Sequence, residues 1–388
     1  MKANNDACAG RSERKVSSRG LAGTARLSLN SMLLPGLLCV GLAAPTVTQA
    51  GPGCATNSEP QVICGVGAPE DLELLPDKKY VLMSSTPGLA HAHRQGLRLM
   101  HVDSKVISDL PIKLAPKKGW GDQNCPAPTQ AIGSHGIHLS KKADGNLQLL
   151  VVNHAGREAI EFLQLFKTEQ GWRAVWRGCV ENKFGSVMND VVSTADGGFV
   201  ATASLEIAAF KADPQFDTLL DGRNTGYLVQ WRDGGVLTKI PGSDAPFPNG
   251  IQLSPDGRVA WFALWTANAI RLFDLKQQRT IKDIPLGFMP DNLSLSEHGS
   301  VLVTGILLAE TFRECYLNKT DACQSAFSVA EISQNSNTIN VLHEAPEGWI
   351  SGASVAIQVE RGIYVGSFTG DRMLYLASVF PEVNVIDR

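Results

Sequence analysis

Polar side chains that could hold a metal ion or move a proton recur at six places along the chain, each at the start of a short apolar run. Carboxylate and amide oxygens dominate the set, with one imidazole among them. Such oxygens are the ligands of hard cations, and Ca²⁺ accepts roughly six to eight of them in irregular geometry. The six places are Glu70-Asp71, His135, Asn189-Asp190, Asn249, Asp291-Asn292, and Ser351 near Ser354.

Taken singly, each place has a simpler interpretation. Asn249-Gly250 is an everyday turn pair and by itself predicts only a tight turn. Five of the six places carry a carboxylate, an amide or an imidazole, however. A buried group containing Glu70 and Asp291 would be unfavourable without a cation to compensate the charge. Zinc favours a tighter set of His and Cys, so the pattern predicts a calcium site if the fold brings these residues together.

The elements that must position these residues form a repeated unit. In "FPNGIQLSPDGRVAWF" a short alternating strand leads through an Asp-Gly turn into a more hydrophobic strand, and "IRLFDL" supplies a third. Turns of this kind join antiparallel strands. The same order begins at Glu70, His135, Asn189, Asn249, Asp291 and Ala353.

Six units of roughly 40–60 residues, with almost no long helical pattern, predict an all-β fold. We expect a six-bladed β-propeller of four-stranded antiparallel blades, in preference to one or two β-sandwiches. The first strand of each blade lines the central channel of a propeller, so the six places would form a ring. Trp172, Trp176, Trp261 and Trp265 lie in or beside strands, and we expect them to pack between blades.

The first 50 residues have the order of a secretory signal: a basic region, the apolar run "MLLPGLLCVGLAAP" and small residues before Ala50. About 14 apolar residues interrupted by Pro35 are too few to span a bilayer. We therefore predict a signal segment over residues 1–50, a propeller domain over residues 51–388, and an exported protein, periplasmic or secreted. A leader that stays uncleaved would give weak membrane association.

The net charge of the chain bears on its binding partners, and its cysteines bear on disulfide formation. The whole chain carries −3 and its first 50 residues carry +4, so the remainder carries −7, which disfavours a nucleic-acid partner. Export would allow the cysteines after the leader to oxidise. Cys315 and Cys323 flank a short loop and form the expected pair; the other pairings stay open, and no oligomeric state is predicted. These cysteines are Cys54, Cys64, Cys125, Cys179, Cys315 and Cys323.

The motifs "PEDLELLPD", "SHGIHLS", "LLVVNHAGREAIEFLQL", "MNDVV", "FPNGIQLSPDGRVAWFA" and "PDNLSLS" resemble the paraoxonase/arylesterase family. The resemblance spans about residues 65–375. It implies a six-bladed propeller with two calcium ions that hydrolyses lactones and esters. It also implies a catalytic calcium held by Glu70, Asn189, Asn249, Asp291 and Asn292, a structural calcium held by Asp71, Asp190 and the carbonyl of Ile137, and a histidine dyad of His135 and His154.

The chain departs from that family pattern at three points. Val187 stands where the family often has an asparagine, and the fifth unit, "VTGILLAE", lacks a histidine that the family often places there. The chain ends "PEVNVIDR" without a cysteine, so Cys64 must pair elsewhere or stay free. The cavity wall, and with it the substrate, is therefore expected to differ.

The expected function is metal-assisted hydrolysis of a small-molecule lactone or aryl ester. Calcium would polarise the carbonyl, His135 would take a proton from water, and His154 would accept that proton or orient His135. Related alternatives are a gluconolactonase-like sugar-lactone hydrolase and a non-catalytic, calcium-stabilised propeller that binds a ligand. No G-x-S-x-G, G-x-G-x-x-G or P-loop motif occurs. His91 and His93 form a further candidate metal pair, in an outer turn.

Overall fold

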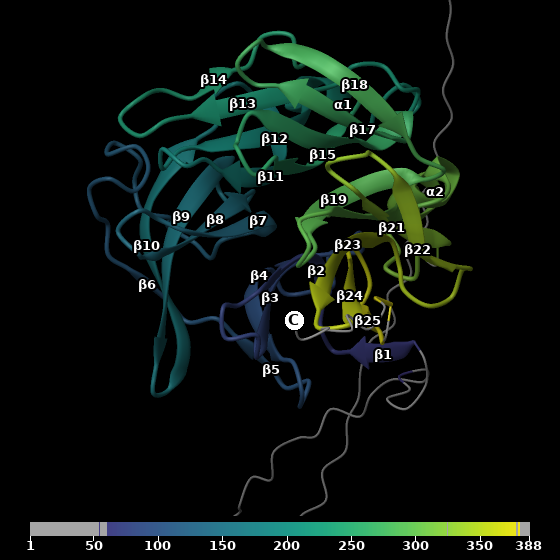
Figure 1. Cartoon of the computed structure of the whole chain (residues 1–388), viewed down its shortest axis with the longest axis horizontal. Coiled ribbons are helices and arrows are strands. Elements are labelled where there is room, and N and C mark those ends of the chain that lie inside the picture. Colours follow the sequence, from purple (N-terminus) through teal and green to yellow (C-terminus); the bar gives the residue numbers. More distant parts are fainter. Residues whose placement is uncertain (1–53, 55–59, 324, 378, 381–388) are drawn as a thin grey trace, which may run out of the picture. The chain divides into compact units, whose positions relative to one another are not determined.

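Six small β-sheets form the part of the chain that carries the repeated units (Figure 1). The computed structural model describes residues 54, 60–323, 325–377 and 379–380. The predicted signal segment, residues 1–50, lies outside these ranges. No helix within them is long and apolar enough to cross a membrane.

Each blade runs in chain order from its inner to its outer strands, except that the outermost strands of the second and sixth blades come from earlier in the chain. The first contains β2 (Ala68–Leu74), β3 (Tyr80–Thr86), β4 (Gly96–His101) and β5 (Ile107–Asp109). The second contains β7 (Ser134–Lys141), β8 (Leu147–Asn153), β9 (Ala159–Thr168), β10 (Gly171–Glu181) and β6 (Ile112–Leu114). The third contains β11 (Ser186–Ser193), β12 (Phe199–Glu206), β13 (Tyr227–Trp231) and β14 (Thr238–Lys239).

The last three blades follow the same plan. The fourth contains β15 (Pro248–Leu253), β16 (Val259–Leu264), β17 (Ala269–Asp274) and β18 (Arg279–Pro285). The fifth contains β19 (Met289–Leu295), β20 (Val301–Ile306), β21 (Phe327–Ile332) and β22 (Ile339–Ala345). The sixth contains β23 (Ala353–Val359), β24 (Gly362–Ser367), β25 (Arg372–Leu376) and β1 (Gln61–Cys64).

The first strands of neighbouring blades contact one another all the way round, from β2 through β7, β11, β15 and β19 to β23 and back to β2. The ring closes because β1, from the start of the domain, pairs antiparallel with β25 of the last blade. The predicted six-bladed β-propeller is therefore confirmed. The pairing joins the start of the domain to its last blade.

The second blade differs from the prediction of four antiparallel strands. Its outer strand β10 has 11 residues, and the short strand β6 pairs parallel to its middle. A disulfide between Cys125 and Cys179 ties the connection after β6 to β10. The added strand covers an edge that a four-stranded sheet would leave exposed.

The other two disulfides are local. Cys315 pairs with Cys323, as predicted. Cys64, at the end of β1, pairs with Cys54. Cys64 is therefore not free. Its bond links β1, the strand that closes the ring, to the residue ten positions before it in the chain.

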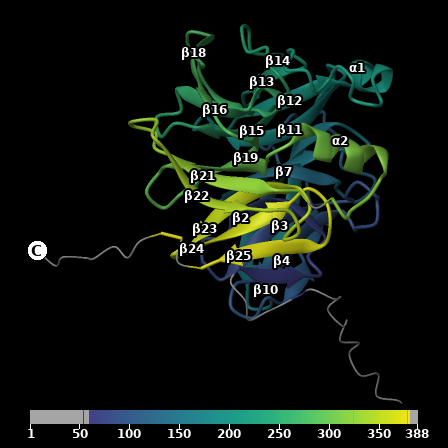
Figure 2. The ribbon, with the colours of Figure 1, turned by 90° about the vertical axis from the view of Figure 1, so that its right-hand side faces the viewer.

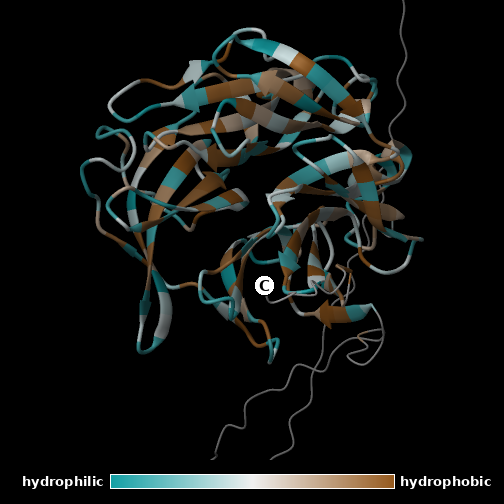
Figure 3. Cartoon of the chain, viewed as in Figure 1, coloured by the Kyte–Doolittle hydropathy of each residue, from teal (hydrophilic) through white to brown (hydrophobic). Residues whose placement is uncertain are grey.

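Apolar side chains fill the space between adjacent sheets. Figure 3 shows strands that are largely hydrophobic and connecting turns that are mostly hydrophilic. Between the second and third blades, for example, Phe162 and Trp231 meet edge to face with ring centroids 5.6 Å apart, and both are buried. Two short helices, α1 (Ile207–Ala212) and α2 (Ala309–Leu317), and a 3-10 turn, η1 (Trp265–Ala267), interrupt the strands. Both α-helices lie on the same side of the sheets (Figure 2).

Every inner strand carries a β-bulge at the same place. Two residues of the inner strand there oppose one residue of the second strand, a distortion that turns side chains in a new direction and is common beside active sites. Asn249-Gly250 therefore lies inside β15 and forms no turn. The bulged pairs are Glu70-Asp71, His135-Gly136, Asn189-Asp190, Asn249-Gly250, Asp291-Asn292 and Ser354-Val355.

Gly250 leaves room for the inner strand of the next blade. A Cβ atom at this position would lie 2.5 Å from the Cα of Asn292 and 2.6 Å from the carbonyl oxygen of Asp291. We expect Gly250→Ala to lower the free energy of unfolding by about 1–3 kcal/mol, because the two strands must move apart. Gly287→Ala is the matched control, since a Cβ there meets nothing within 4 Å. Equal denaturation midpoints for the two variants would show that the strands are not in close contact.

Candidate active site

A cavity of about 440 Å³ opens where the bulged inner strands meet. Most of the predicted residues line it. Asn292 lies directly behind the wall, where its amide Nδ2 donates to Oε1 of Glu70 at 2.5 Å and to the Glu70 carbonyl at 3.1 Å. The candidate residues in the lining itself are Glu70, His135, His154, Asn189, Asn249 and Asp291.

Four oxygens of this group have no hydrogen-bond partner among the described residues, although all four are buried. They are Glu70 Oε2, Asn189 Oδ1, Asn249 Oδ1 and Asn292 Oδ1. An unpaired buried oxygen costs about 1–3 kcal/mol, so four in one place favour a shared bound partner. Oxygen-rich, largely amide coordination suits a hard cation such as calcium.

The raised pKa values of two carboxyl groups at the cavity floor also favour a bound cation. Burial raises the pKa of Glu70 well above its ordinary value, and the nearby Asp291 raises it further. Burial also raises the pKa of Asp291 to about 8, against the opposing effect of a hydrogen bond from Asn249. Both carboxylates are therefore costly to ionise unless positive charge lies beside them. Within the described ranges, no three His, Cys, Asp or Glu side chains form a metal-binding group, so amides supply most of the donor set.

Asp71 and Asp190, the second residues of their bulges, face away from the cavity and join inner strands to one another. Oδ2 of Asp71 accepts the backbone N–H of Ile137 at 2.7 Å, and Oδ2 of Asp190 accepts that of Ile251 at 2.7 Å. Burial raises the pKa of both carboxyl groups. The neighbouring charge of Glu70 raises the pKa of Asp71 further, and the charge of Asp71 does the same for Asp190. Ile137 thus meets Asp71 through its N–H, whereas the predicted ligand is its carbonyl.

The two histidines form a hydrogen-bonded chain that continues to a carboxylate. His135 Nδ1 lies 3.1 Å from His154 Nε2, and His154 Nδ1 lies 2.8 Å from Oε1 of Glu158. At the other end, His135 Nε2 lies 3.3 Å from the Asn189 amide nitrogen and 3.4 Å from Oε1 of Glu70. The His135 side chain is 24% exposed, on the side of the cavity. Loss of solvent around the ring lowers its pKa most, and the nearby His154 lowers it further, to about 3.

Glu158 is a residue that the sequence analysis missed. Its only signal is its position four residues after His154 in "NHAGREAIE". That spacing would mean little in a strand, where side chains alternate. It brings the two groups together here because residues 154–158 form the turn between β8 and β9.

A buried charge network holds this turn in place. Glu161, fully buried in β9, accepts hydrogen bonds from Arg157 at 2.8–3.0 Å, from Trp176 Nε1 at 2.7 Å and from Asn153 Nδ2 at 2.8 Å. Asn153 in turn accepts the N–H groups of Gly133 and Ala155, each at 2.9 Å. These bonds fix the backbone on both sides of His154.

Aromatic rings form the upper wall of the cavity. Trp265, in η1, lies 4.9 Å from Phe247 and 4.8 Å from Phe312 of α2 between ring centroids. Phe312 also packs against Phe368 at 5.8 Å. Tyr316 completes the wall, close to the disulfide at the end of α2. Trp265 also packs against Met289 and Ile306 of the next blade, which confirms its predicted role between blades, while its ring lines the cavity.

The loop of residues 87–95, between β3 and β4, covers one side of the cavity. His91 lines the cavity, whereas the His93 ring lies 3.3 Å from a carboxylate oxygen of Asp321. Asp321 also accepts the N–H of Ala90 at 3.0 Å and the hydroxyl of Thr369 at 2.6 Å. The predicted pairing of His91 with His93, and its place in an outer turn, are therefore wrong, because the loop bends over the cavity.

The chain is similar to known proteins in its sequence and in its chain path. A family model described as Arylesterase matches residues 120–377. Serum paraoxonase/arylesterase 1 of Homo sapiens is 24% identical over 242 residues, which cover 61% of this chain and 65% of that relative's length.

Solved structures with a similar chain path were also found. Regucalcin, a calcium-binding protein from Agrobacterium tumefaciens, is 14% identical, with a TM-score of 0.47 over 81% of this chain and 90% of its own. A luciferin-regenerating enzyme is 12% identical, with a TM-score of 0.47 over 81% of this chain and 94% of its own.

Proposed function

Because this chain belongs to the arylesterase family, we propose that it is a calcium-dependent hydrolase of carboxylic esters and lactones. The family match confirms the resemblance predicted from the sequence motifs. The observation that carries the proposal is the group of four unpaired buried oxygens beside His135 at the floor of the cavity. That arrangement combines a place for a cation with a proton acceptor and a space for a substrate.

The cation site of the proposal has five side-chain ligands from four blades. Once bound, calcium would draw electron density from the substrate carbonyl and stabilise the negative charge that develops on its oxygen. A second, structural calcium would lie near Asp71, Asp190 and the carbonyl of Ile137, and the two carboxylates are already partly satisfied by backbone N–H groups. The catalytic ligands are Glu70, Asn189, Asn249, Asp291 and Asn292.

His135 is the proposed general base. Its Nε2 lies in the cavity wall, within 3.4 Å of Glu70, so it would accept a proton from a water molecule positioned there. The oxygen of that water attacks the carbonyl carbon, and the ester C–O bond then breaks with transfer of a proton to the leaving oxygen. His154, at 3.1 Å, orients His135 or takes the proton from it. No covalent enzyme intermediate is required.

The aromatic wall favours an apolar ester or lactone over a sugar lactone. Four of its rings belong to Phe247, Trp265, Phe312 and Phe368, and the loop of residues 87–95 adds Leu89. Such a surface binds an aryl or alkyl group well. A polyhydroxylated sugar ring would need a hydrogen-bonding partner for each hydroxyl. The gluconolactonase-like alternative therefore has less support.

We also propose that the protein is exported into an oxidising compartment. The three disulfides agree with this location.

Hydrolysis assays with the purified protein in calcium test this proposal. Phenyl acetate and an alkyl-substituted γ-lactone should be hydrolysed with at least tenfold higher kcat/KM than glucono-δ-lactone. His135→Gln should lower kcat by roughly 10²–10⁴-fold, the usual contribution of a general base. His138→Gln, on the same strand and outside the cavity lining, is the matched control. A protein that binds calcium but hydrolyses none of these substrates would instead be a binding module.

A further inference from the structure

We propose that Glu158 is a positioning residue, which orients His154 and through it selects the tautomer of His135 that can act as a base. The inference rests on the proposed hydrolysis and extends it by one residue. Glu158 does not line the cavity, and it acts only through the His154 ring, 2.8 Å away.

The direction of each hydrogen bond follows from the carboxylate end of the chain. An ionised carboxylate only accepts, so Nδ1 of His154 must carry the proton of the 2.8 Å bond to Glu158. Nε2 of a neutral His154 is then an acceptor, and the 3.1 Å bond requires Nδ1 of His135 to donate. Nε2 of His135, the nitrogen in the cavity wall, is consequently left without a proton.

The other end of the chain leads independently to the same tautomer. The amide nitrogen of Asn189 lies 3.3 Å from Nε2 of His135, and an amide NH₂ group can only donate. A donor in this position requires an unprotonated Nε2. Glu70 Oε1, 3.4 Å from the same nitrogen, already accepts the Asn292 amide at 2.5 Å, so the two ends of the network agree on an unprotonated Nε2.

Glu158 is held firmly enough to impose this order. Its second oxygen, Oε2, accepts the backbone N–H of Met188 at 3.2 Å, so the carboxylate links the second blade to β11 of the third. The Glu158 side chain is 18% exposed, compared with 28% for His154. The peptide N–H of His154 donates to the carbonyl of Gly133 at 3.0 Å, which fixes the ring from its backbone side.

Glu158 also has a role after the water has reacted. When His135 Nε2 receives the proton of water, its Nδ1 proton can pass to Nε2 of His154. His154 then carries protons on both nitrogens and a positive charge, and the Glu158 carboxylate stabilises that charge through the existing Nδ1–H bond. No proton moves to Glu158 itself, and no other reactant is needed.

Glu158→Gln and Glu158→Asp test the inference. We expect Glu158→Gln to lower kcat by roughly 10- to 100-fold, the usual effect of losing a partner that orients a functional histidine, with KM changed less than twofold. Glu158→Asp keeps two acceptor oxygens, whereas Gln has a single one to share between His154 and the Met188 N–H, so Glu158→Asp should recover part of that loss. Glu297→Gln, which removes a 43% exposed carboxylate paired with Lys78, is the matched control and should leave kcat unchanged.

Nitrogen-15 NMR of the histidine side chains provides a readout that does not depend on activity. In the calcium-loaded wild type, His135 and His154 should both appear as Nδ1-protonated tautomers. Glu158→Gln should give mixed tautomers at both rings at an unchanged melting temperature. Identical tautomers in the two proteins, or equal kcat for them, would overturn the role of Glu158. A wild type that hydrolyses no ester would refute the proposed function, while the NMR comparison would still decide the positioning.

Discussion

Removal of calcium with a chelator is expected to abolish ester hydrolysis and to lower the melting temperature of the protein by roughly 5 °C. A ligand present at 100 times its dissociation constant stabilises the folded state by about 2.7 kcal/mol. In a domain of this size, each kcal/mol corresponds to roughly 2 °C. Calorimetry and an esterase assay on the same samples, with and without added calcium, measure both effects.

Asp291→Asn tests the same site. Its melting temperature relative to the wild type should be equal or higher without calcium and lower with calcium. Without calcium, the variant should melt at the same temperature as the wild type or higher, since it removes a buried carboxylate whose ionisation burial disfavours. With calcium, the variant should lose most of the stabilisation that the wild type gains, because one of the two charged ligands is missing.

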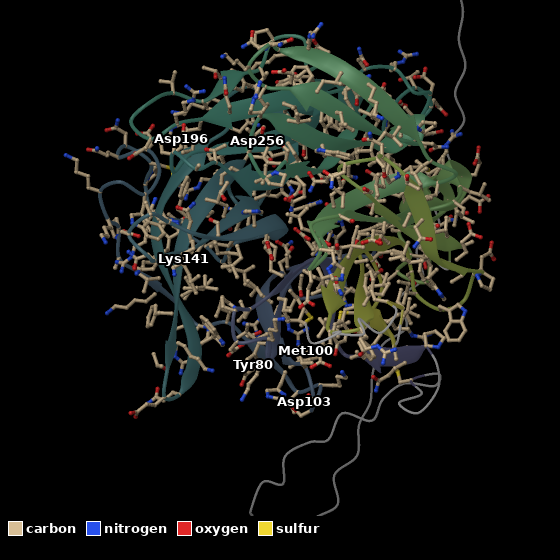
Figure 4. The ribbon with its side chains drawn as sticks, viewed as in Figure 1. Tyr80, Met100, Asp103, Lys141, Asp196 and Asp256 are labelled. Carbon is tan, nitrogen blue, oxygen red and sulfur yellow. A yellow bond between two sulfur atoms is a disulfide. The ribbon has the colours of Figure 1, made fainter. Side chains whose placement is uncertain are left out.

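Asp256→Asn is the matched control for Asp291→Asn. Asp256 lies exposed in the turn between β15 and β16, and it lines a surface pocket together with Asp196 from the equivalent turn of the neighbouring blade (Figure 4). Its replacement should leave the calcium-dependent shift intact. A wild-type protein whose melting temperature does not respond to calcium, or an Asp291→Asn variant that responds fully, would contradict the proposed metal site.

Arg157→Ala is expected to lower the free energy of unfolding by about 3–5 kcal/mol, the usual effect of removing one partner of a buried ion pair. Glu161 is fully buried and would keep only the neutral donors of Trp176 and Asn153. The turn that carries His154 would lose its anchor at the same time, so kcat should fall as well. Chemical denaturation followed by tryptophan fluorescence measures the stability change.

Arg223→Ala provides the comparison for Arg157→Ala. Arg223 pairs with Asp221, but its side chain is 57% exposed, and surface pairs of this kind contribute about 0–1 kcal/mol. The difference between the two variants therefore isolates the effect of burial. Equal losses would mean that Glu161 is solvated or protonated in the folded protein and that the network does not fix the His154 turn.

The sequence predicted much of the fold, because the signals for it are local. Alternating apolar residues and Asp-Gly turns specify short antiparallel strands wherever they occur, and six copies in order specify a propeller. The candidate ligands were also visible, since they recur at the same place in each unit. The Cys315–Cys323 bond followed from its short loop in the same way.

Other features depend on contacts between segments that lie far apart in the chain. The bulge that places Asn249 inside β15 needs the β16 register and the close approach of β19, neither of which a turn-like Asn-Gly pair reveals. The aromatic wall comes from insertions between strands, which have no counterpart in the repeated unit.

The repeated strand unit, and the chemical nature of the groups at its inner ends, can be recognised from the amino-acid sequence. Which of those groups face one another depends on how the six blades pack. Glu158 illustrates the difference. One of its carboxylate oxygens bonds to His154, and the other is held by the backbone N–H of Met188 in the next blade. The physical reason is that local patterns set backbone conformation, whereas the direction of a side chain within a channel is set by the packing of neighbouring blades.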